Sequence, residues 1–468
     1  MESAARRLAS AAAIGRFAAV PHAVRAAYRD FLLDTVAVMA AGAAHPSLAP
    51  ARAAFLAAGG AGRASAAGFP EGGPAGIAGL VNGAAMTVLQ LQDGHRRARG
   101  HPMSHVLPAA LAIAEETDAP APAFLDAVMA GYEISARIGT ALGGMQPLLH
   151  DTGTFGCIGA AVAAAHLFGR EGDEAGRAAL IEAAIGNAAA IALFPFRDTC
   201  MEGAGVHHLF VGLGVQNGIQ AAQAALAGLF PSPATLERFF GPCAGEAFDP
   251  GLLADGIGAD GAWSRHEIAA AYLKWHPVCA HLGPMIDCIE ALRERLGGFD
   301  PERIDHVRVQ IYATALQYDS PRPESDLAAR FSFRHAAALA LSFGPLRHDS
   351  FFPERFRRPE IEDLAAKVAL EADPRLDALY PANRPTRVTL VLANGHEESA
   401  EVLVPKGDGP RALTRLDVDA KAGRLMDVAW GEGHGGMIRA LIDSVENAAP
   451  ADLPTRLGHA LRHPFLTP

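Results

Sequence analysis

Apolar positions recur at helical spacing along most of the first 267 residues of the chain. Within residues 22–43, Leu32, Val36 and Met39 share one face, and Gly42 follows as a stop signal. The same spacing predicts further helices, rich in alanine and other small residues, over 48–58, 74–88, 106–117, 122–143 and 177–193. We therefore predict that this region is helical and that its apolar side chains form a core.

The pattern of polar and apolar positions changes after about residue 265. Residues 305–314 alternate as a strand does, and 331–344 has the spacing of a short helix. Residues 386–409 form two strand-like runs joined at Asn394-Gly395, a favoured hairpin turn. This mixture predicts an α+β segment.

Helical spacing returns over residues 415–462. A helical domain interrupted by an α+β insertion is the simplest account of this order. We predict a mainly α protein, with a large all-helical domain at 1–267 and 410–468 and a smaller α+β lid domain at 268–409.

Composition and charge narrow the class of protein. With 468 residues and 50% hydrophobic side chains, the chain is long enough for a large core. The formal net charge of -11 argues against nucleic acid as a partner, because phosphate binding needs a basic surface. No apolar run approaches the ~20 residues of a membrane helix, and the first residues suggest an amphipathic helix. We predict a cytoplasmic protein without a nucleic-acid or membrane partner.

The five cysteines do not suggest a disulfide framework. None of them forms a CxxC pair, and their number is odd. Zinc ribbons and iron–sulfur clusters are usually held by closely spaced thiolates. We therefore predict neither of these centres.

Residues 89–116 contain the densest group of side chains that could carry chemistry. A glycine-broken loop comes first, and an apolar helix begins near Val106. A loop of charged side chains held on a core helix is typical of a functional site. Arginines in an otherwise acidic protein suit a small carboxylated or phosphorylated ligand. The residues concerned are Asp93, His95, Arg96, Arg97, Arg99, His101 and His105.

Two further stretches are predicted to fold beside this loop. In HDTGTFG, His150 precedes a Thr/Gly turn that opens an apolar helix, and Thr154 lies at the helix start. Unpaired backbone N–H groups there suit a carboxylate, although an N-cap with close helix packing explains the same residues equally well. The other stretch, KWHPVCAH, carries Lys274, Cys279 and His281 around a helix break.

These side chains suit general acid–base catalysis without a metal. The sequence has no P-loop, HExxH or GxSxG motif. Removing a proton next to a carboxylate creates negative charge that His, Lys, Arg and helix N-termini can stabilise. The alternative is a metal site at Asp93, His95, His101 and His105, but this loop has no established ligand spacing.

Several stretches, in this order, resemble the MmgE/PrpD family of 2-methylcitrate dehydratase and cis-aconitate decarboxylase. The block LQLQDGHRRARGHPMSHVLPAALAIAEE is similar to an acid-rich family segment, and later segments match HDTGTFG and KWHPVCAHLGPMID. FLLDTVAVMAAG, GYEISARIG, AARFSFRHAAALALSFG and PKGDGPRALT complete the series. The resemblance implies a helical domain with an α+β lid, a homodimer, and a site between the domains. It also implies a di- or tricarboxylate substrate and no metal or organic cofactor.

The resemblance also implies roles for individual residues. By motif position, the catalytic residues are Asp93, His101, His150 and Lys274. The predicted substrate-binding residues are His95, Arg97, Thr154, His207, Cys279, His281 and Ser332.

Three departures from the family pattern bear on the substrate. Gln90 and Gln92 stand where members often have a carboxylate. His207 occupies a position where many members have lysine, which exchanges a fixed cation for a group that titrates near neutrality. His105 is an addition to the usual HP segment. Together these differences argue against copying the dehydratase substrate.

The leading hypothesis is a metal-independent hydro-lyase that acts on a di- or tricarboxylate such as 2-methylcitrate. His101 or His150 is the base or the acid, and Lys274 with nearby arginines holds carboxylates. Two other enzymes use related chemistry: a dicarboxylate epimerase or isomerase, and a cis-aconitate-type decarboxylase. A carboxylate-binding protein without catalysis is the alternative from another class.

Overall fold

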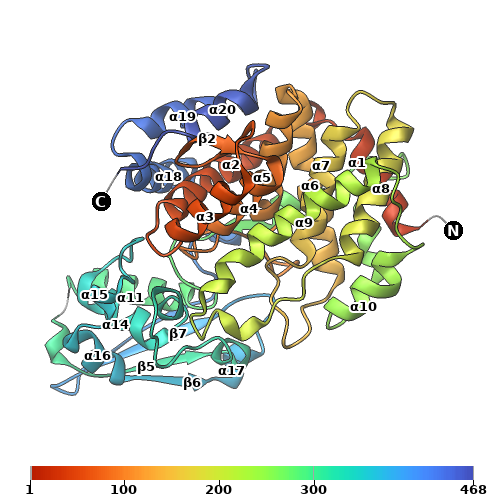
Figure 1. The fold of residues 1–468 in the computed structure, drawn as a ribbon. Helices are drawn as coiled ribbons and strands as arrows, with labels where there is room; N and C mark the ends of the chain where they lie inside the picture. Colours follow the sequence, from red (N-terminus) through yellow and green to blue (C-terminus); the bar gives the residue numbers. More distant parts are fainter. Residues whose placement is uncertain (1–2, 299, 467–468) are drawn as a thin grey trace.

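The computed structural model describes residues 3–298 and 300–466, and its ribbon shows two parts (Figure 1). Each part has its own hydrophobic core. The larger core is formed by side chains within residues 5–273 and 418–461. The smaller core is formed mainly by side chains within residues 278–390. The prediction of a mainly helical protein with a smaller α+β part is confirmed.

The larger part is built from packed helices, with two short antiparallel strand pairs. The strands are β1 (Ala64–Ala66) with β2 (Phe69–Gly73), and β3 (Asp93–His95) with β4 (Ala271–Leu273). These pairs depart from the prediction of an all-helical domain, since their three to five residues are too short for a readable alternation. The helices are α1 (Ala4–Ile14), α2 (His22–Ala43), α3 (Ala49–Gly59), α4 (Ala75–Ala85), α5 (Pro102–Glu116), α6 (Ala121–Ala141), α7 (Phe155–Phe168), α8 (Glu174–Ala190), α9 (Leu209–Leu226) and α10 (Gly241–Ala244), followed after the lid by α18 (Arg415–Trp430), α19 (His434–Asp443) and α20 (Leu453–Leu461).

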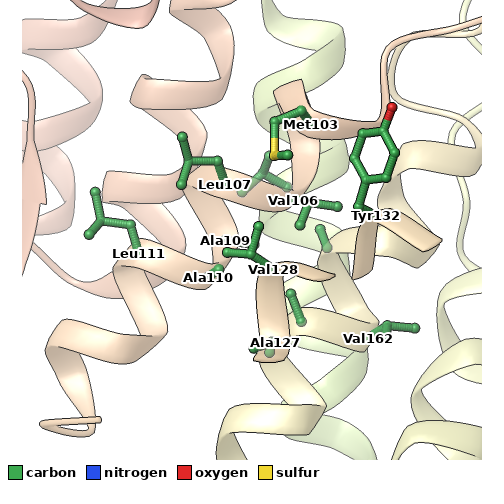
Figure 2. Close-up of a cluster of buried hydrophobic side chains, with 14 of the residues drawn as sticks. Met103, Val106, Leu107, Ala109, Ala110, Leu111, Ala127, Val128, Tyr132 and Val162 are labelled. Carbon is green, nitrogen blue, oxygen red and sulfur yellow. The ribbon is translucent and has the colours of Figure 1, made fainter. Parts of the chain in front are cut away.

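Helix α7 lies in the interior of this part because it has no polar face. All of its residues except the last are buried, as expected of a helix that is apolar all round. Glycine permits close packing on α6, because a Cβ at Gly159 would lie 2.7 Å from the Cβ of Ser135. Figure 2 shows the adjoining interior, where Leu107 of α5, Val128 of α6 and Val162 of α7 gather. Neither α7 nor any other helix in the described ranges is long and apolar enough to cross a membrane.

The smaller part is a four-stranded sheet with helices packed on it. The strand order is β6-β5-β7-β8, in which β5 runs parallel to β6 and antiparallel to β7, and β8 is antiparallel to β7. In β5, the side chains of Ile304, Val307, Val309 and Ile311 are buried, which explains the alternation in the sequence. The strands are β5 (Ile304–Ile311), β6 (Val368–Ala372), β7 (Thr386–Leu392) and β8 (Glu397–Val402); the helices are α11 (Gly283–Arg295), α12 (Ala313–Leu316), α13 (Asp326–Ala329), α14 (Phe333–Phe343), α15 (Pro353–Phe356), α16 (Pro359–Ala366) and α17 (Pro374–Asp377).

Helix α18 returns the chain to the larger part, where it lies against α2 (Figure 1). Its buried Lys421 forms an ion pair with Asp34 of α2, with 2.7 Å between Nζ and the carboxylate. The same ammonium donates to the carbonyl oxygens of Leu91, at 3.2 Å, and Lys274, at 2.6 Å. One side chain from the end of the chain therefore holds two segments that carry predicted site residues.

A buried arginine ties the smaller part to the larger one. Arg330 donates to the carbonyl oxygens of Leu89 and Pro277, each at 3.1 Å. Since Leu273 packs in the larger core and Val278 in the smaller one, we propose that the lid domain begins near residue 275 rather than at 268.

Candidate active site

A cavity of about 530 Å³ is formed by side chains from both parts of the molecule. A space of this size suits a small molecule. Five of the predicted site residues lie on its wall, namely His101, His150, Lys274, Cys279 and His281. The other polar side chains of the lining are Gln90, Arg99, Gln146, Asp151, Arg197, Glu246, Tyr272, Thr314, Gln317, Tyr318, Tyr380 and Arg384.

His101 presents an unprotonated nitrogen to the cavity. It lies immediately before α5, and its Nδ1–H donates to the carbonyl oxygen of Asp93. In the neutral ring this bond leaves Nε2 as the lone-pair nitrogen, 3.8 Å from a carboxylate oxygen of Asp151. Burial lowers the pKa of His101 to about 4, so the ring is neutral at physiological pH. His101 can therefore accept a proton.

His150 has the opposite tautomer. Its Nδ1 accepts the backbone N–H of Thr152 at 3.1 Å, so the proton of the neutral ring lies on Nε2. Burial, with smaller effects from Lys274 and Arg197, lowers the pKa of His150 to about 4. The two histidines thus offer complementary groups, a lone pair on His101 and an N–H donor on His150.

Lys274 provides a buried cation in the same cavity. The residue follows β4 directly, and the pairing of β4 with β3 places it beside the His101 loop. Burial lowers the pKa of Lys274 to about 8, so the ammonium is protonated near neutral pH but gives up its proton readily. A pKa close to the working pH suits a general acid.

Cys279 and His281 form part of the lid side of the cavity. Burial raises the pKa of the Cys279 thiol, so it remains protonated at neutral pH. His281 stacks on Tyr318 with ring centroids 4.4 Å apart, and its Nδ1 is hydrogen-bonded to the hydroxyl of Tyr312. Burial lowers the pKa of His281 to about 3, so this ring is neutral. Its fixed orientation suits hydrogen bonding to a ligand.

Three arginines of the lining were not predicted as substrate-binding residues. Arg99, Arg197 and Arg384 come from three separate segments, and Arg384 also packs its guanidinium 5.1 Å from the ring centre of Tyr272. With Lys274, these groups outnumber the two carboxylates of the lining, Asp151 and Glu246. The excess of positive charge favours an anionic ligand. Arg384 lies between a helix and a strand in NRPT, where no periodic pattern marks it.

Asp93 supports the wall of the cavity from behind. Its carboxylate accepts the backbone N–H groups of Met103 and Ser104, each at 3.0 Å, and the Ser104 hydroxyl at 2.7 Å. These are the first-turn donors of α5, so Asp93 stabilises the start of that helix. Since its carbonyl also holds His101, Asp93 orients this histidine and does not line the cavity.

The buried Asp93 carboxyl predicts a pH-dependent stability. Burial raises its pKa to about 6, whereas an unfolded aspartate has a pKa of about 3.9. The folded state therefore holds the proton more tightly than the unfolded state does. The resulting contribution of Asp93 to the free energy of unfolding is complete below about pH 4 and is lost as the pH rises through 6. We expect a loss of roughly 3 kcal/mol across this window, which Asp93→Asn removes. Midpoints of thermal unfolding between pH 4 and 7 test this difference.

The matched control for this experiment is Asp363→Asn, at an exposed position on α16. This variant should keep the wild-type dependence on pH. If the unfolding midpoint of Asp93→Asn depends on pH as that of the wild type does, Asp93 is not the cause of the pH-dependent stability.

His95 and Arg97 lie outside the cavity lining as well. His95 accepts the Ala98 backbone N–H at Nδ1, at 3.1 Å, and its Nε2–H donates to the Glu267 carbonyl at 3.0 Å. Arg97 is exposed and pairs with the Glu267 carboxylate. Alternate residues of a strand face opposite sides, and β3 directs Asp93 and His95 away from the side where Gly94 meets Tyr272.

Thr154 and Ser332 have local structural contacts. Thr154 donates its hydroxyl to the carbonyl oxygen of His150 at 2.7 Å, which fixes the turn before α7. Ser332 accepts the backbone N–H of His335 at 3.3 Å and caps α14. Neither side chain lines the cavity, so we do not propose that Thr154 or Ser332 contacts a substrate.

Comparisons with known proteins identify the family of this chain. Models of the MmgE/PrpD N-terminal domain and the MmgE/PrpD C-terminal domain match residues 6–244 and 276–447, respectively. The chain belongs to the MmgE/PrpD family.

Its relatives include proteins named cis-aconitate decarboxylase. The protein of Homo sapiens is 27% identical over 317 residues, which cover 64% of this chain and 62% of the relative. That of Mus musculus is 27% identical over 327 residues, covering 66% and 64%. That of Aspergillus terreus (strain NIH 2624 / FGSC A1156) is 25% identical over 359 residues, covering 70% of each chain. The match thus spans less than two thirds of the mammalian relatives.

Gln90 and His207, which we interpret from the sequence as differences from the family pattern, meet in the structure. Gln90 lines the cavity, and its side-chain amide lies 3.4 Å from Nε2 of His207. His207 is buried behind His150, with ring centroids 4.9 Å apart. Burial, and then the neighbouring His150, lowers the pKa of His207 well below its usual value. Neither Gln90 nor His207 therefore places a charge beside His150.

The third departure, His105, joins the two histidine loops. Its Nδ1–H donates to the carbonyl oxygen of His101 at 3.0 Å, and its Nε2 accepts the Gly153 backbone N–H at 2.9 Å. Burial lowers its pKa to about 4, which maintains the neutral tautomer that these two bonds require. In this MmgE/PrpD protein, His105 thus fixes the loop of His101 against the turn after His150.

Proposed function

We propose that this protein is a lyase that acts on a small di- or tricarboxylate by acid–base catalysis at a carbon next to a carboxylate. The observation that carries the proposal is the opposite tautomers of His101 and His150 in a cavity with an excess of basic side chains. The names of the family relatives support a lyase, since they describe removal of a carboxyl group from a tricarboxylate.

In the proposed reaction, the arginines of the cavity hold the substrate carboxylates. Nε2 of His101 takes the proton from the carbon, and the charge that develops spreads onto the adjoining carboxylate. The N–H of His150 donates a hydrogen bond to that oxygen, and the fixed positive charges stabilise the dianion. The ammonium of Lys274 then gives a proton to the departing hydroxyl, which leaves as water while the carbon–carbon double bond forms. These steps need no metal.

A decarboxylase is the second candidate, favoured by the names of the relatives. In that reaction the carboxyl group leaves as carbon dioxide, and its bonding electrons pass to the neighbouring carbon. The ammonium of Lys274 then supplies the proton that this carbon takes up. The same cationic groups stabilise the carbanionic intermediate in both reactions.

Nuclear magnetic resonance in D₂O tests the proposal with a panel of citrate, 2-methylcitrate, cis-aconitate and malate. We expect deuterium to enter a carbon next to a carboxylate of one compound, and the product to show loss of water or of carbon dioxide. Exchange with inversion at that carbon, and no loss of a group, would favour an epimerase and contradict the lyase. Thermal stabilisation by a compound that never exchanges would favour a binding protein.

The two titrating groups of the proposed mechanism predict a bell-shaped pH dependence. His101 must be neutral to act as base, so kcat/KM should fall as the pH drops through about 4. Lys274 must be protonated, so kcat/KM should fall again as the pH rises through about 8. A bound dianion raises the pKa of His101, so the acid limb of kcat should lie at higher pH. Rates measured between pH 3.5 and 10 on a reactive panel compound test this profile.

Lys274→Arg separates the two limbs. The guanidinium stays charged throughout this range, so the fall near pH 8 should disappear. The remaining rate should be lower, because arginine is a poor proton donor. A basic limb that persists near pH 8 in this variant would assign it to another group.

A further inference from the structure

A second set of possible ligands lies beside the catalytic histidines and takes no part in the proposed reaction. His150, Cys200 and His207 each offer one ligand atom, and these atoms lie within 4.8 Å of one another. His150 precedes α7, Cys200 follows a short helical turn (Arg197–Thr199), and His207 belongs to the next turn (Gly205–His208). Three separate turns therefore meet at one point.

We propose that His150, Cys200 and His207 form a binding site for a soft divalent cation such as Zn²⁺ beside the cavity, which His150 lines. Two imidazoles and a thiolate are a donor set that zinc prefers, and three protein ligands leave a fourth position open to water or an anion. The cavity provides that open side, because His150 lines it.

The unsatisfied hydrogen-bonding capacity of His207 is independent support. Its side chain is fully buried, and Nδ1 has no hydrogen-bond partner among the described residues. A buried polar atom without a partner is costly, and a metal ion would satisfy it. Since Gln90 lies at Nε2, Nδ1 is the nitrogen that His207 leaves for an ion.

The other two residues can supply a donor without breaking the fold. Thr152 occupies Nδ1 of His150, which leaves Nε2 for coordination. The Cys200 thiol donates to the carbonyl oxygen of Arg197 at 3.0 Å, and burial raises its pKa. Binding would release this thiol proton to solvent, so the affinity should increase with pH.

The charges around the site affect its affinity for a cation. Asp151 lies next to His150 and favours a cation, whereas Lys274 and Arg197 repel one. Binding should therefore be reversible. An ion here would occupy the nitrogen that His150 needs for its hydrogen bond to substrate. Inhibition by the metal rests on the proposed function, but binding of the metal does not.

Titration of the full-length protein with Co²⁺ tests the site without an activity assay. Cobalt in a tetrahedral site with a thiolate ligand gives near-ultraviolet charge-transfer absorption and intense visible bands. We expect both in the wild type, and we expect Zn²⁺ to displace the cobalt. Cys200→Ser should lose the charge-transfer band, and His207→Gln should weaken binding at least tenfold. Thermal unfolding without metal confirms that each variant is folded.

Cys279→Ala and Cys243→Ala are the matched controls. Cys279 is a buried cavity thiol outside the group, and Cys243 is the exposed cysteine. Both variants should retain the band. The proposal is overturned if the wild type shows no band, if Cys200→Ser keeps it, or if either control loses it. Binding of Zn²⁺ without any loss of deuterium exchange would leave the site intact and contradict the role proposed for His150.

Discussion

Replacing His101 by asparagine is expected to lower kcat by about 10²- to 10⁴-fold, the usual contribution of a general base. Asparagine can still donate a hydrogen bond to the Asp93 carbonyl from its amide, so the start of α5 should remain in place. What the variant lacks is the basic lone pair that Nε2 presents to the cavity. Turnover, and deuterium exchange into the substrate, measure the effect together.

The control for this variant is His396→Asn, on the hairpin of the lid, where the histidine side chain is 53% exposed. This substitution should leave kcat unchanged. A His101→Asn protein that is folded and keeps more than a tenth of the wild-type rate would exclude His101 as the base. His150 and His281 would then be the remaining neutral histidines of the cavity lining.

Replacing Lys421 by methionine should produce the largest loss of stability, about 3–5 kcal/mol. The change leaves Asp34 as a buried carboxylate without its cation, and it removes a donor from the carbonyl oxygens of Leu91 and Lys274. The midpoint of thermal unfolding measures the loss. Because Lys274 is held through its backbone, we also expect a higher KM in the protein that remains folded.

Two comparison variants test whether the buried ion pair of Asp34 and Lys421 accounts for this loss of stability. Arg439→Met removes a partly exposed ion pair with Asp419, 2.7 Å long, and should cost less than about 1 kcal/mol. The double variant Asp34→Leu/Lys421→Met should recover part of the stability, since it no longer strands a buried charge. A Lys421→Met protein as stable as Arg439→Met would show that the buried pair contributes little.

Much of the fold follows from periodicity, because burial imposes a regular spacing on the side chains. The helical spacing within residues 22–43 corresponds to α2, and the alternation in residues 305–314 corresponds to β5. The strand β6 was not predicted. It pairs with β5 through backbone hydrogen bonds, yet Val368 is its only buried side chain, so its sequence lacks the alternation of a half-buried strand.

Residues of the cavity could be predicted from the sequence only where a histidine or lysine lies beside a predicted turn. His101, His150 and Lys274 each lie at the junction of a loop with a helix or strand, and the structure places all three in the lining of one cavity. Their roles remain proposals. Arg97 is close to His101 in the sequence but lies outside the cavity lining, where it pairs with Glu267. Arg384 reaches the cavity only through tertiary packing, for which one sequence gives no signal.

The return of α18 to α2 has a consequence for synthesis of the protein in the cell. Asp34 and its partner Lys421 are separated by about 390 residues. At about 5–20 residues per second, the ribosome needs roughly 20–80 s to make the intervening chain. During that interval the face of α2 that α18 will cover is exposed on the nascent protein, together with an unpaired acid. We therefore expect chains that end before residue 421, and so lack this ion pair, to depend on chaperones and to be degraded early by proteases.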